Sequence, residues 1–153
     1  MRATPAIDVV CDASVVLQWF RAEGERDVDA ARDLVTAHRE GRILAKVIDL
    51  TPYEVGNALM RGRAGASAAA TSTVLRSLAS ICDAIAPDAT DLAHASELVE
   101  AHNLTFYEAV YASVAARRGA VLASADRELL EAGLAKTPSA VMEELRLNDQ
   151  VVD

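Results

Sequence analysis

Short apolar runs alternate along this chain with longer segments whose apolar residues recur at helical spacing. Short runs rich in apolar and β-branched residues are typical of buried strands. They predict strands at 6–11, 43–50, 84–86 and 120–123, and the pattern is weakest at 43–50.

Helical spacing occupies the segments between these runs. Thr51-Pro52 opens one helix, because proline is well tolerated in a first turn. In the helix predicted at 88–102 the inward residues are Leu92, Ala95, Ser96 and Val99. In the helix predicted at 106–118 they are Phe106, Ala109, Val110, Ser113 and Val114.

Strands separated by amphipathic helices predict an α/β fold, with a parallel sheet covered on both faces. Ligands of such sheets bind beyond the carboxyl ends of the strands. The 153 residues suffice for one core and contain no repeat or linker, so we expect a single domain over 1–153.

The net charge of −8 bears on the possible partners. Proteins that hold nucleic acid by neutralising phosphates are basic. This chain therefore either does not bind nucleic acid or binds it through cations that bridge carboxylates to phosphate. On charge alone, an acidic surface that only keeps the protein in solution is the simpler interpretation.

Two classes of protein are disfavoured by the sequence. No apolar run approaches the length of a membrane span, and the first residues lack the pattern of a secretory signal. Cys11 and Cys82 stand alone, without metal-site spacing, and are predicted to be buried and reduced. We therefore expect a cytoplasmic protein without membrane association.

Four acidic residues fall where a predicted strand ends or a predicted helix begins. Asp12 and Asp126 follow strands, whereas Glu54 and Glu108 lie in the first turns of helices. Because these positions meet at one edge of a parallel sheet, we expect the four carboxylates to lie together.

Each of the four also has a structural interpretation that, for a single residue, is the commoner one. Thr51 and Thr105 each stand three residues before one of the glutamates, the spacing of a capping box. The two aspartates match simple helix N-caps.

As a set, the four carboxylates favour a metal site. Crowded carboxylates repel one another, which raises their pKa values and destabilises the fold unless a cation lies between them. Oxygen-only ligands select hard ions such as Mg²⁺ or Mn²⁺. Such an ion activates water and stabilises a phosphate under attack, so the set predicts phosphodiester hydrolysis.

Four segments resemble the motifs of VapC-like PIN-domain toxins. They are VCDASVVLQWF at 10–20, TPYEVGNAL at 51–59, LTFYEAVYASVA at 104–115 and VLASADREL at 121–129. Their order and spacing are kept over about 7–134. Four motifs in register are far more specific than any one of them.

The resemblance implies a three-layer α/β/α PIN fold with a central parallel sheet. It implies a Mg²⁺- or Mn²⁺-dependent endoribonuclease acting on transfer or ribosomal RNA. It also implies a homodimer and a small cognate antitoxin that blocks the site, as in a toxin–antitoxin pair. By motif position, the catalytic set is Asp12, Glu54, Glu108 and Asp126, of which Asp12 and Asp126 bind the metal; Ser14, Asn57 and Ser124 support them.

Two positions depart from the family pattern. Glu108 stands where the third motif normally has Asp, which moves the carboxylate by about 1.5 Å, one C–C bond. Displacements of this size weaken catalysis, so Glu108 is expected to act less well than Asp, unless its longer side chain bends back. Ser124 stands where Thr is usual and keeps the hydroxyl.

Arginines and aromatic residues are secondary candidates. Contacts with RNA phosphates are predicted for Arg61, Arg63, Arg117 and Arg118. The alternative interpretation is that these arginines are solvated residues at helix ends. Arg117 and Arg118 would then be favoured in the last turn of a helix by the helix dipole. Tyr107 and Tyr111 share a helix face and are expected to pack with their hydroxyls at the surface.

Two functions of different classes remain open at this stage. The first is an active endoribonuclease. The second, motivated by Glu108, is a PIN-fold binding module that holds an antitoxin or RNA with little or no cleavage. A phosphohydrolase with an aspartate at the sheet edge is disfavoured, because Asp12-Ala13-Ser14 lacks the second aspartate of that pattern.

Overall fold

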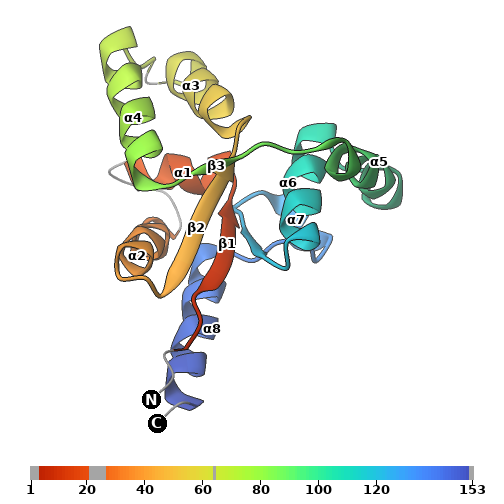
Figure 1. Ribbon diagram of the computed structural model, residues 1–153. Helices are drawn as coiled ribbons and strands as arrows, with labels where there is room; N and C mark the ends of the chain where they lie inside the picture. The colour runs from red at the N-terminus through yellow and green to blue at the C-terminus, as the bar shows by residue number, and fades with distance from the viewer. Residues whose placement is uncertain (1–3, 21–26, 64, 152–153) are drawn as a thin grey trace.

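The computed structural model describes residues 4–20, 27–63 and 65–151, which form strands and helices in alternation (Figure 1). The strands are β1 (Ile7–Cys11), β2 (Ile43–Ile48), β3 (Ala84–Ile85) and β4 (Val121–Ala123). The helices are α1 (Ala13–Phe20), α2 (Val28–Arg39), α3 (Thr51–Arg61), α4 (Ala68–Ile81), α5 (Ala89–His102), α6 (Phe106–Arg117), α7 (Arg127–Glu131) and α8 (Pro138–Val151). All four predicted strands are present.

The strands form one parallel sheet in the order β3-β2-β1-β4. The chain adds β2 and β3 on one side of β1 and then returns to place β4 on the other side. In open α/β sheets this reversal leaves a crevice beyond the carboxyl ends of the two strands. The register pairs Cys11 with Ala123, so the segments that leave β1 and β4 start at the same level.

Helices cover both faces of the sheet, which confirms the three-layer α/β/α architecture (Figure 1). One core lies between the sheet and α1, α2, α3, α4 and α8, and the other between the sheet and α5, α6 and α7. Side chains alternate between the faces of a strand, so Val9 and Cys11 enter the first core and Val10 enters the second.

The inward face of α5 differs from the predicted one. Of the predicted residues, Ala95 is fully buried and Val99 packs against the second core, but Leu92 is 40 % exposed and Ser96 is exposed as well. Asp91, which was not predicted to face inward, is fully buried. A prediction based on apolar spacing does not place Asp91 on the inward face, because an ionised side chain is normally solvated. Asp91 is buried since arginines pair with it, and the helix is rotated accordingly.

Helix α6 is enclosed on more sides than its sequence pattern indicates. The predicted inward residues are buried except Phe106, which is 44 % exposed. Tyr111, Ala112 and Ala115 are buried as well. The helix packs against both the sheet and α5, so no single apolar stripe describes its buried surface.

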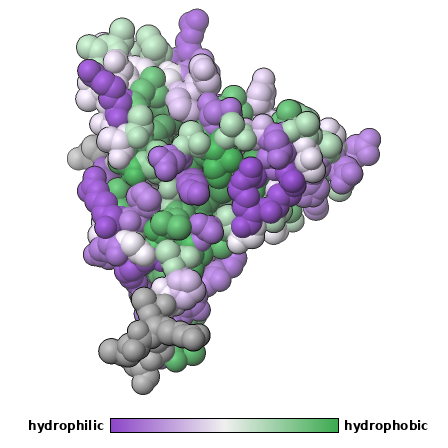
Figure 2. Space-filling view, in the orientation of Figure 1, coloured by the Kyte–Doolittle hydropathy of each residue, from purple (hydrophilic) through white to green (hydrophobic). Residues whose placement is uncertain are grey.

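In the described ranges, part of the second sheet face has no helix over it. Leu44 of β2 is 44 % exposed, beside a shallow hollow of about 150 Å³ whose lining includes Val10 and Ile85. In the view of Figure 2, hydrophobic residues gather over the middle of the molecule and hydrophilic residues surround them. Among the described residues, no helix combines the length and apolar character needed to cross a bilayer.

Candidate functional site

The carboxyl ends of β1 and β4 meet at the crevice that the strand order creates. Asp12 follows β1, and its backbone N–H donates to the Ala123 carbonyl at the end of β4 (3.2 Å). Asp126 follows β4, while α3 and α6 bring Glu54 and Glu108. All four predicted acidic residues line one cleft of about 300 Å³.

Asp12 is the buried member of this set, with only 5 % of its surface exposed. Three donors hold its carboxylate. The Ser14 hydroxyl and the Val15 N–H donate to Oδ1 at 2.5 and 3.2 Å, and the Ser124 hydroxyl donates to Oδ2. The Val15 bond also closes the first turn of α1 in the manner of an N-cap.

The two serines are oriented toward Asp12 by the backbone. Ser14 Oγ accepts the Ala125 N–H, and Ser124 Oγ accepts the Asp126 N–H, each at 2.9 Å. A hydroxyl has a single hydrogen, which in each serine points to the Asp12 carboxylate. The two predicted supporting serines thus both donate hydrogen bonds to Asp12, an arrangement that favours its ionised carboxylate.

Burial raises the pKa of the Asp12 carboxyl above its usual 3.8, against the opposing effect of its hydrogen bonds, and the charge of Asp126 adds to the rise. Burial also raises the pKa of Glu54 above its usual 4.5; the Tyr111 bond opposes this shift, and Asp12 and Glu108 reinforce it. For both groups burial is the larger cause of the rise in pKa, and the neighbouring carboxylates add to it. A divalent cation in this partly dry cleft would stabilise the ionised forms against both effects.

Glu54 does not form the capping box predicted from its spacing to Thr51. The residue before α3 is Leu50, which provides no side-chain cap. The Thr51 hydroxyl is buried and accepts the Ile48 N–H (3.2 Å). Glu54 Oε1 instead accepts the Tyr111 hydroxyl (2.8 Å), so α6 holds this carboxylate at the cleft.

Glu108 forms its predicted capping box and still reaches the other carboxylates. Its Oε2 accepts the Thr105 N–H (2.8 Å), and its own N–H donates to Thr105 Oγ1 (3.2 Å). Glu108, Asp126 and Glu128 each offer a carboxylate oxygen, and these oxygens lie within 4.8 Å of one another. The longer side chain bends back, so the departure from Asp does not remove the carboxylate from the site.

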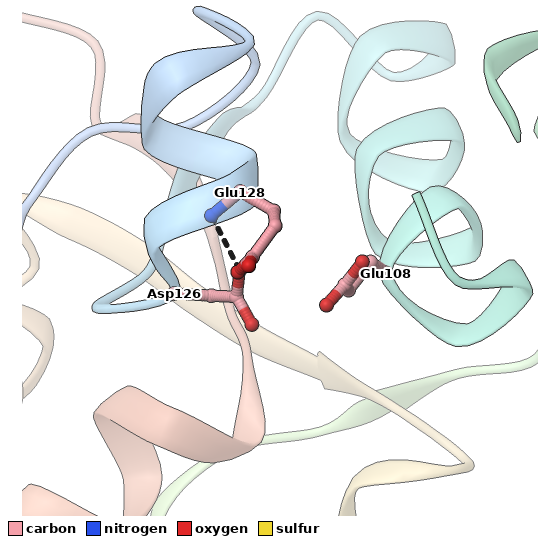
Figure 3. Close-up of side chains that lie close together, drawn as sticks. All are labelled: Glu108, Asp126 and Glu128. Carbon is pink, nitrogen blue, oxygen red and sulfur yellow. Dashed lines mark hydrogen bonds between the residues drawn. The ribbon is translucent and has the colours of Figure 1, made fainter. Parts of the chain in front are cut away.

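Asp126 is the N-cap of α7, as its sequence position predicts. Its Oδ1 accepts the N–H groups of Glu128 (3.0 Å) and Leu129 (3.3 Å). Figure 3 shows the carboxylates of Asp126 and Glu128 beside each other, with Glu108 across from them. Glu128 is absent from the predicted set; only the fold brings its carboxylate beside those of Glu108 and Asp126.

The described residues that line the rest of the cleft carry no positive charge. Its lining contains small and aromatic side chains, among them Ala13, Ala58 and Tyr107, and no lysine or arginine of the described ranges. A phosphate that enters this cleft meets only negative groups, which repel it strongly in a partly dry environment.

The other predicted site residues lie outside the lining of this cleft. Asn57 is exposed on α3, and in the described part of the chain no hydrogen bond joins it to the acidic set. Arg61 and Arg63 are exposed at the far end of α3. Arg117 and Arg118 lie at the far end of α6, about 14 Å along the helix from its acidic first turn.

Arg117 and Arg118 bind Asp91, which is fully buried in the first turn of α5. Arg117 donates to Oδ1 at 2.6 Å, and Arg118 donates to both oxygens at 3.1 and 3.2 Å. Burial on its own would raise the pKa of Asp91, but Arg118, the Asp88 N–H and Arg117 hold it far below its usual range. The network ties α5 to α6.

Comparison with known proteins identifies the family of this chain and several solved structures with a similar fold. A family model of the PIN domain matches residues 9–134. A search of curated proteins returns no match to this chain. Among solved structures, the chain is similar to PAE2754 from Pyrobaculum aerophilum, with 30% identity and a TM-score of 0.67, over 93% of this chain and 98% of that one.

Two further structures share the fold at lower identity. One is a toxin–antitoxin complex from Klebsiella pneumoniae, with 14% identity and a TM-score of 0.62, over 85% of this chain and 97% of that one. The other is Mycobacterium tuberculosis VapC20, described as a sarcin–ricin loop cleaving toxin, with 20% identity and a TM-score of 0.64, over 82% of this chain and 95% of that one.

Proposed function

Because this chain belongs to the PIN domain family, we propose that it is a divalent-metal-dependent endoribonuclease and the toxin of a toxin–antitoxin pair. One observation carries the proposal. The carboxylates of Asp12, Glu54, Glu108 and Asp126 come from separate elements and converge on one cleft. Helix capping does not account for this convergence, since Glu54 caps no helix.

The donor set fits a hard divalent cation, since every candidate ligand is a carboxylate oxygen. We assign the ion to Asp12 and Asp126. Glu54, Glu108 and Glu128 complete the set, and the last two place oxygens within 4.8 Å of Asp126. A bound Mg²⁺ or Mn²⁺ would lower the pKa of a water molecule and neutralise the attacked phosphate.

The contribution of the protein is to fix the carboxylates before RNA arrives. Two serine hydroxyls hold Asp12, the Tyr111 hydroxyl holds Glu54, and a backbone N–H holds Glu108. Groups held in this way need little reorganisation during the reaction. The proposed products carry 5′-phosphate and 3′-hydroxyl ends.

The proposed substrate is transfer or ribosomal RNA. The fold neighbour VapC20 is described as cleaving the sarcin–ricin loop, which supports a ribosomal target. At a net charge of −8 the protein cannot rely on phosphate neutralisation over a wide surface. Arg61 and Arg63 are exposed and remain candidate phosphate contacts, whereas Arg117 and Arg118 are already engaged by Asp91.

The proposal includes two protein partners in the cytoplasm. A small cognate antitoxin would block the acidic cleft, and a second copy of the chain would form a homodimer. The toxin–antitoxin complex from Klebsiella pneumoniae has the same fold, which supports the first of these.

Purified protein free of antitoxin is expected to cleave transfer or ribosomal RNA with Mg²⁺ or Mn²⁺ and to be inactive in EDTA. Denaturing gels read the products. Cleavage that continues in EDTA would contradict the metal requirement. A folded protein that binds Mn²⁺ but cuts neither RNA would favour the second function, a PIN-fold module that binds antitoxin or RNA without cleavage.

Glu108→Asp is expected to lower the cleavage rate about tenfold or more. The aspartate side chain is shorter by one bond, so its carboxylate cannot reach both of the groups that the Glu108 carboxylate contacts. It would lose either the Thr105 bond or the approach to Asp126. Folding should be retained, since Asp91 completes the same type of capping box with Asp88 in α5. The cleavage rate and the thermal unfolding temperature are measured for this variant. An equal or faster rate would contradict the prediction that cleavage needs both contacts of Glu108.

A further inference from the structure

A line of buried hydroxyl groups joins the end of β2 to the carboxylate of Glu54. The Ile48 N–H donates to Thr51 Oγ1 (3.2 Å), and Thr51 Oγ1 lies 2.7 Å from the Tyr111 hydroxyl. The Tyr111 hydroxyl donates to Glu54 Oε1 (2.8 Å). Thr51 is fully buried and Tyr111 is 3 % exposed, so water does not compete for these bonds.

The direction of every hydrogen in this line follows from the groups at its ends. A carboxylate can only accept, so the single hydrogen of Tyr111 goes to Glu54. The Tyr111 oxygen must then accept from Thr51, whose own oxygen already accepts a backbone N–H. All hydrogens point toward the cleft, and bonds aligned in this way strengthen one another.

The line fixes a side chain that would otherwise be flexible. Glu54 is half-buried on α3 and is held by Tyr111 of α6. Tyr111 is held in turn by Thr51 at the start of α3, whose hydroxyl accepts the backbone N–H of Ile48 in β2. In the described part of the chain, no hydrogen bond occupies Glu54 Oε2. One oxygen is thus tied to the protein and the other is left for a ligand in the cleft.

We infer that Tyr111 is a positioning residue, which holds Glu54 Oε1 so that Oε2 is presented to the proposed cation. The inference rests on the metal site of the proposed function. The ring of Tyr111 is buried because it packs in the second core. Packing accounts for the ring but not for the hydroxyl that it carries. The hydroxyl lies between two side chains of α3, and its carboxylate partner lines the acidic cleft.

The test measures Mn²⁺ binding by calorimetry, which reads the site without RNA. Tyr111→Phe keeps the ring and removes the hydroxyl. We expect its dissociation constant for Mn²⁺ to rise about 10- to 100-fold, as for other groups that orient a metal ligand. Tyr53→Phe is the matched control: it also removes a tyrosine hydroxyl, but Tyr53 is 77 % exposed on α3 and does not line the cleft, so the Mn²⁺ affinity should stay within about twofold of that of the unaltered protein.

A double-mutant cycle separates positioning of Glu54 from a general structural effect. In a Glu54→Gln background, Tyr111→Phe should cause no further loss of Mn²⁺ affinity. Thr51→Val, which removes the hydroxyl that orients Tyr111, should weaken binding in the same direction, whereas Thr51→Ser should preserve it. Thermal unfolding without metal verifies that each variant is folded at the assay temperature.

The outcomes distinguish this inference from the function on which it rests. If the unaltered protein binds no Mn²⁺, the proposed metal site is wrong and the role of Tyr111 is lost with it. If the unaltered protein binds Mn²⁺ but Tyr111→Phe binds equally well, the metal site stands and the inference is overturned. An equal loss in the presence and absence of Glu54→Gln would also overturn it.

Discussion

Asp12→Asn is expected to reduce RNA cleavage by more than about 100-fold, since even residues that only orient a metal ligand cost up to that factor. The substitution keeps the size of the side chain but removes the one buried charge of the acidic cleft. It also places an amide N–H₂ against serine hydroxyls that are oriented to donate, so both the cation and the local hydrogen bonds lose an acceptor.

Asp8→Asn is the matched control for this experiment. Asp8 lies on the same strand, but it is exposed and borders the hollow on the open sheet face, away from the acidic cleft. Its variant should cleave RNA within about twofold of the unaltered protein, since a lone surface charge contributes little. Circular dichroism establishes that both variants are folded. Full activity of folded Asp12→Asn would remove the basis of the nuclease proposal.

Asp91→Ala is expected to lower the free energy of unfolding by about 3 kcal/mol, the low end of the range for a buried ion pair. Asp91 is completely buried, and its removal deprives Arg117 and Arg118 of their shared partner. The loss stays at the low end because both arginine side chains are 33% exposed and can turn to water. Urea denaturation measures it.

The control for Asp91 is an ion pair on the surface. Glu131→Ala removes the partner of Arg127, in a pair whose side chains are 83% and 64% exposed. Such pairs contribute at most about 1 kcal/mol, so this variant should unfold close to the unaltered protein. Equal stability of Asp91→Ala and Glu131→Ala would show that the buried network does not hold α5 to α6.

The same network predicts a dependence of stability on pH. The folded-state pKa of Asp91 lies far below the unfolded value, so the folded state favours the ionised form. Its stabilising contribution is complete above the unfolded pKa, near 3.9, and is lost as the pH falls from there through the folded value. Between pH 6 and pH 3 the unaltered protein should therefore lose more stability than Asp91→Ala.

The acidic set was predictable from sequence because its signal is local. Each of Asp12, Glu54, Glu108 and Asp126 follows a strand or opens a helix, and a parallel sheet collects such positions at one edge. The capping predictions show the limit of the same reasoning. Identical Thr-x-x-Glu spacings gave a capping box at Glu108 and none at Glu54, because a tyrosine from another helix competes for Glu54.

The order of strands and helices, the parallel sheet and the position of the acidic edge were determined by the sequence alone, since periodicity and turn residues act within a few neighbours. Tertiary structure alone decided the burial of Asp91, the inward hydroxyl of Tyr111 and the inclusion of Glu128. Each depends on a partner that folding brings close: Tyr111 and Glu54 are 57 residues apart. The free energy of a buried polar group is set by the partner it meets, and one-dimensional spacing does not specify that partner.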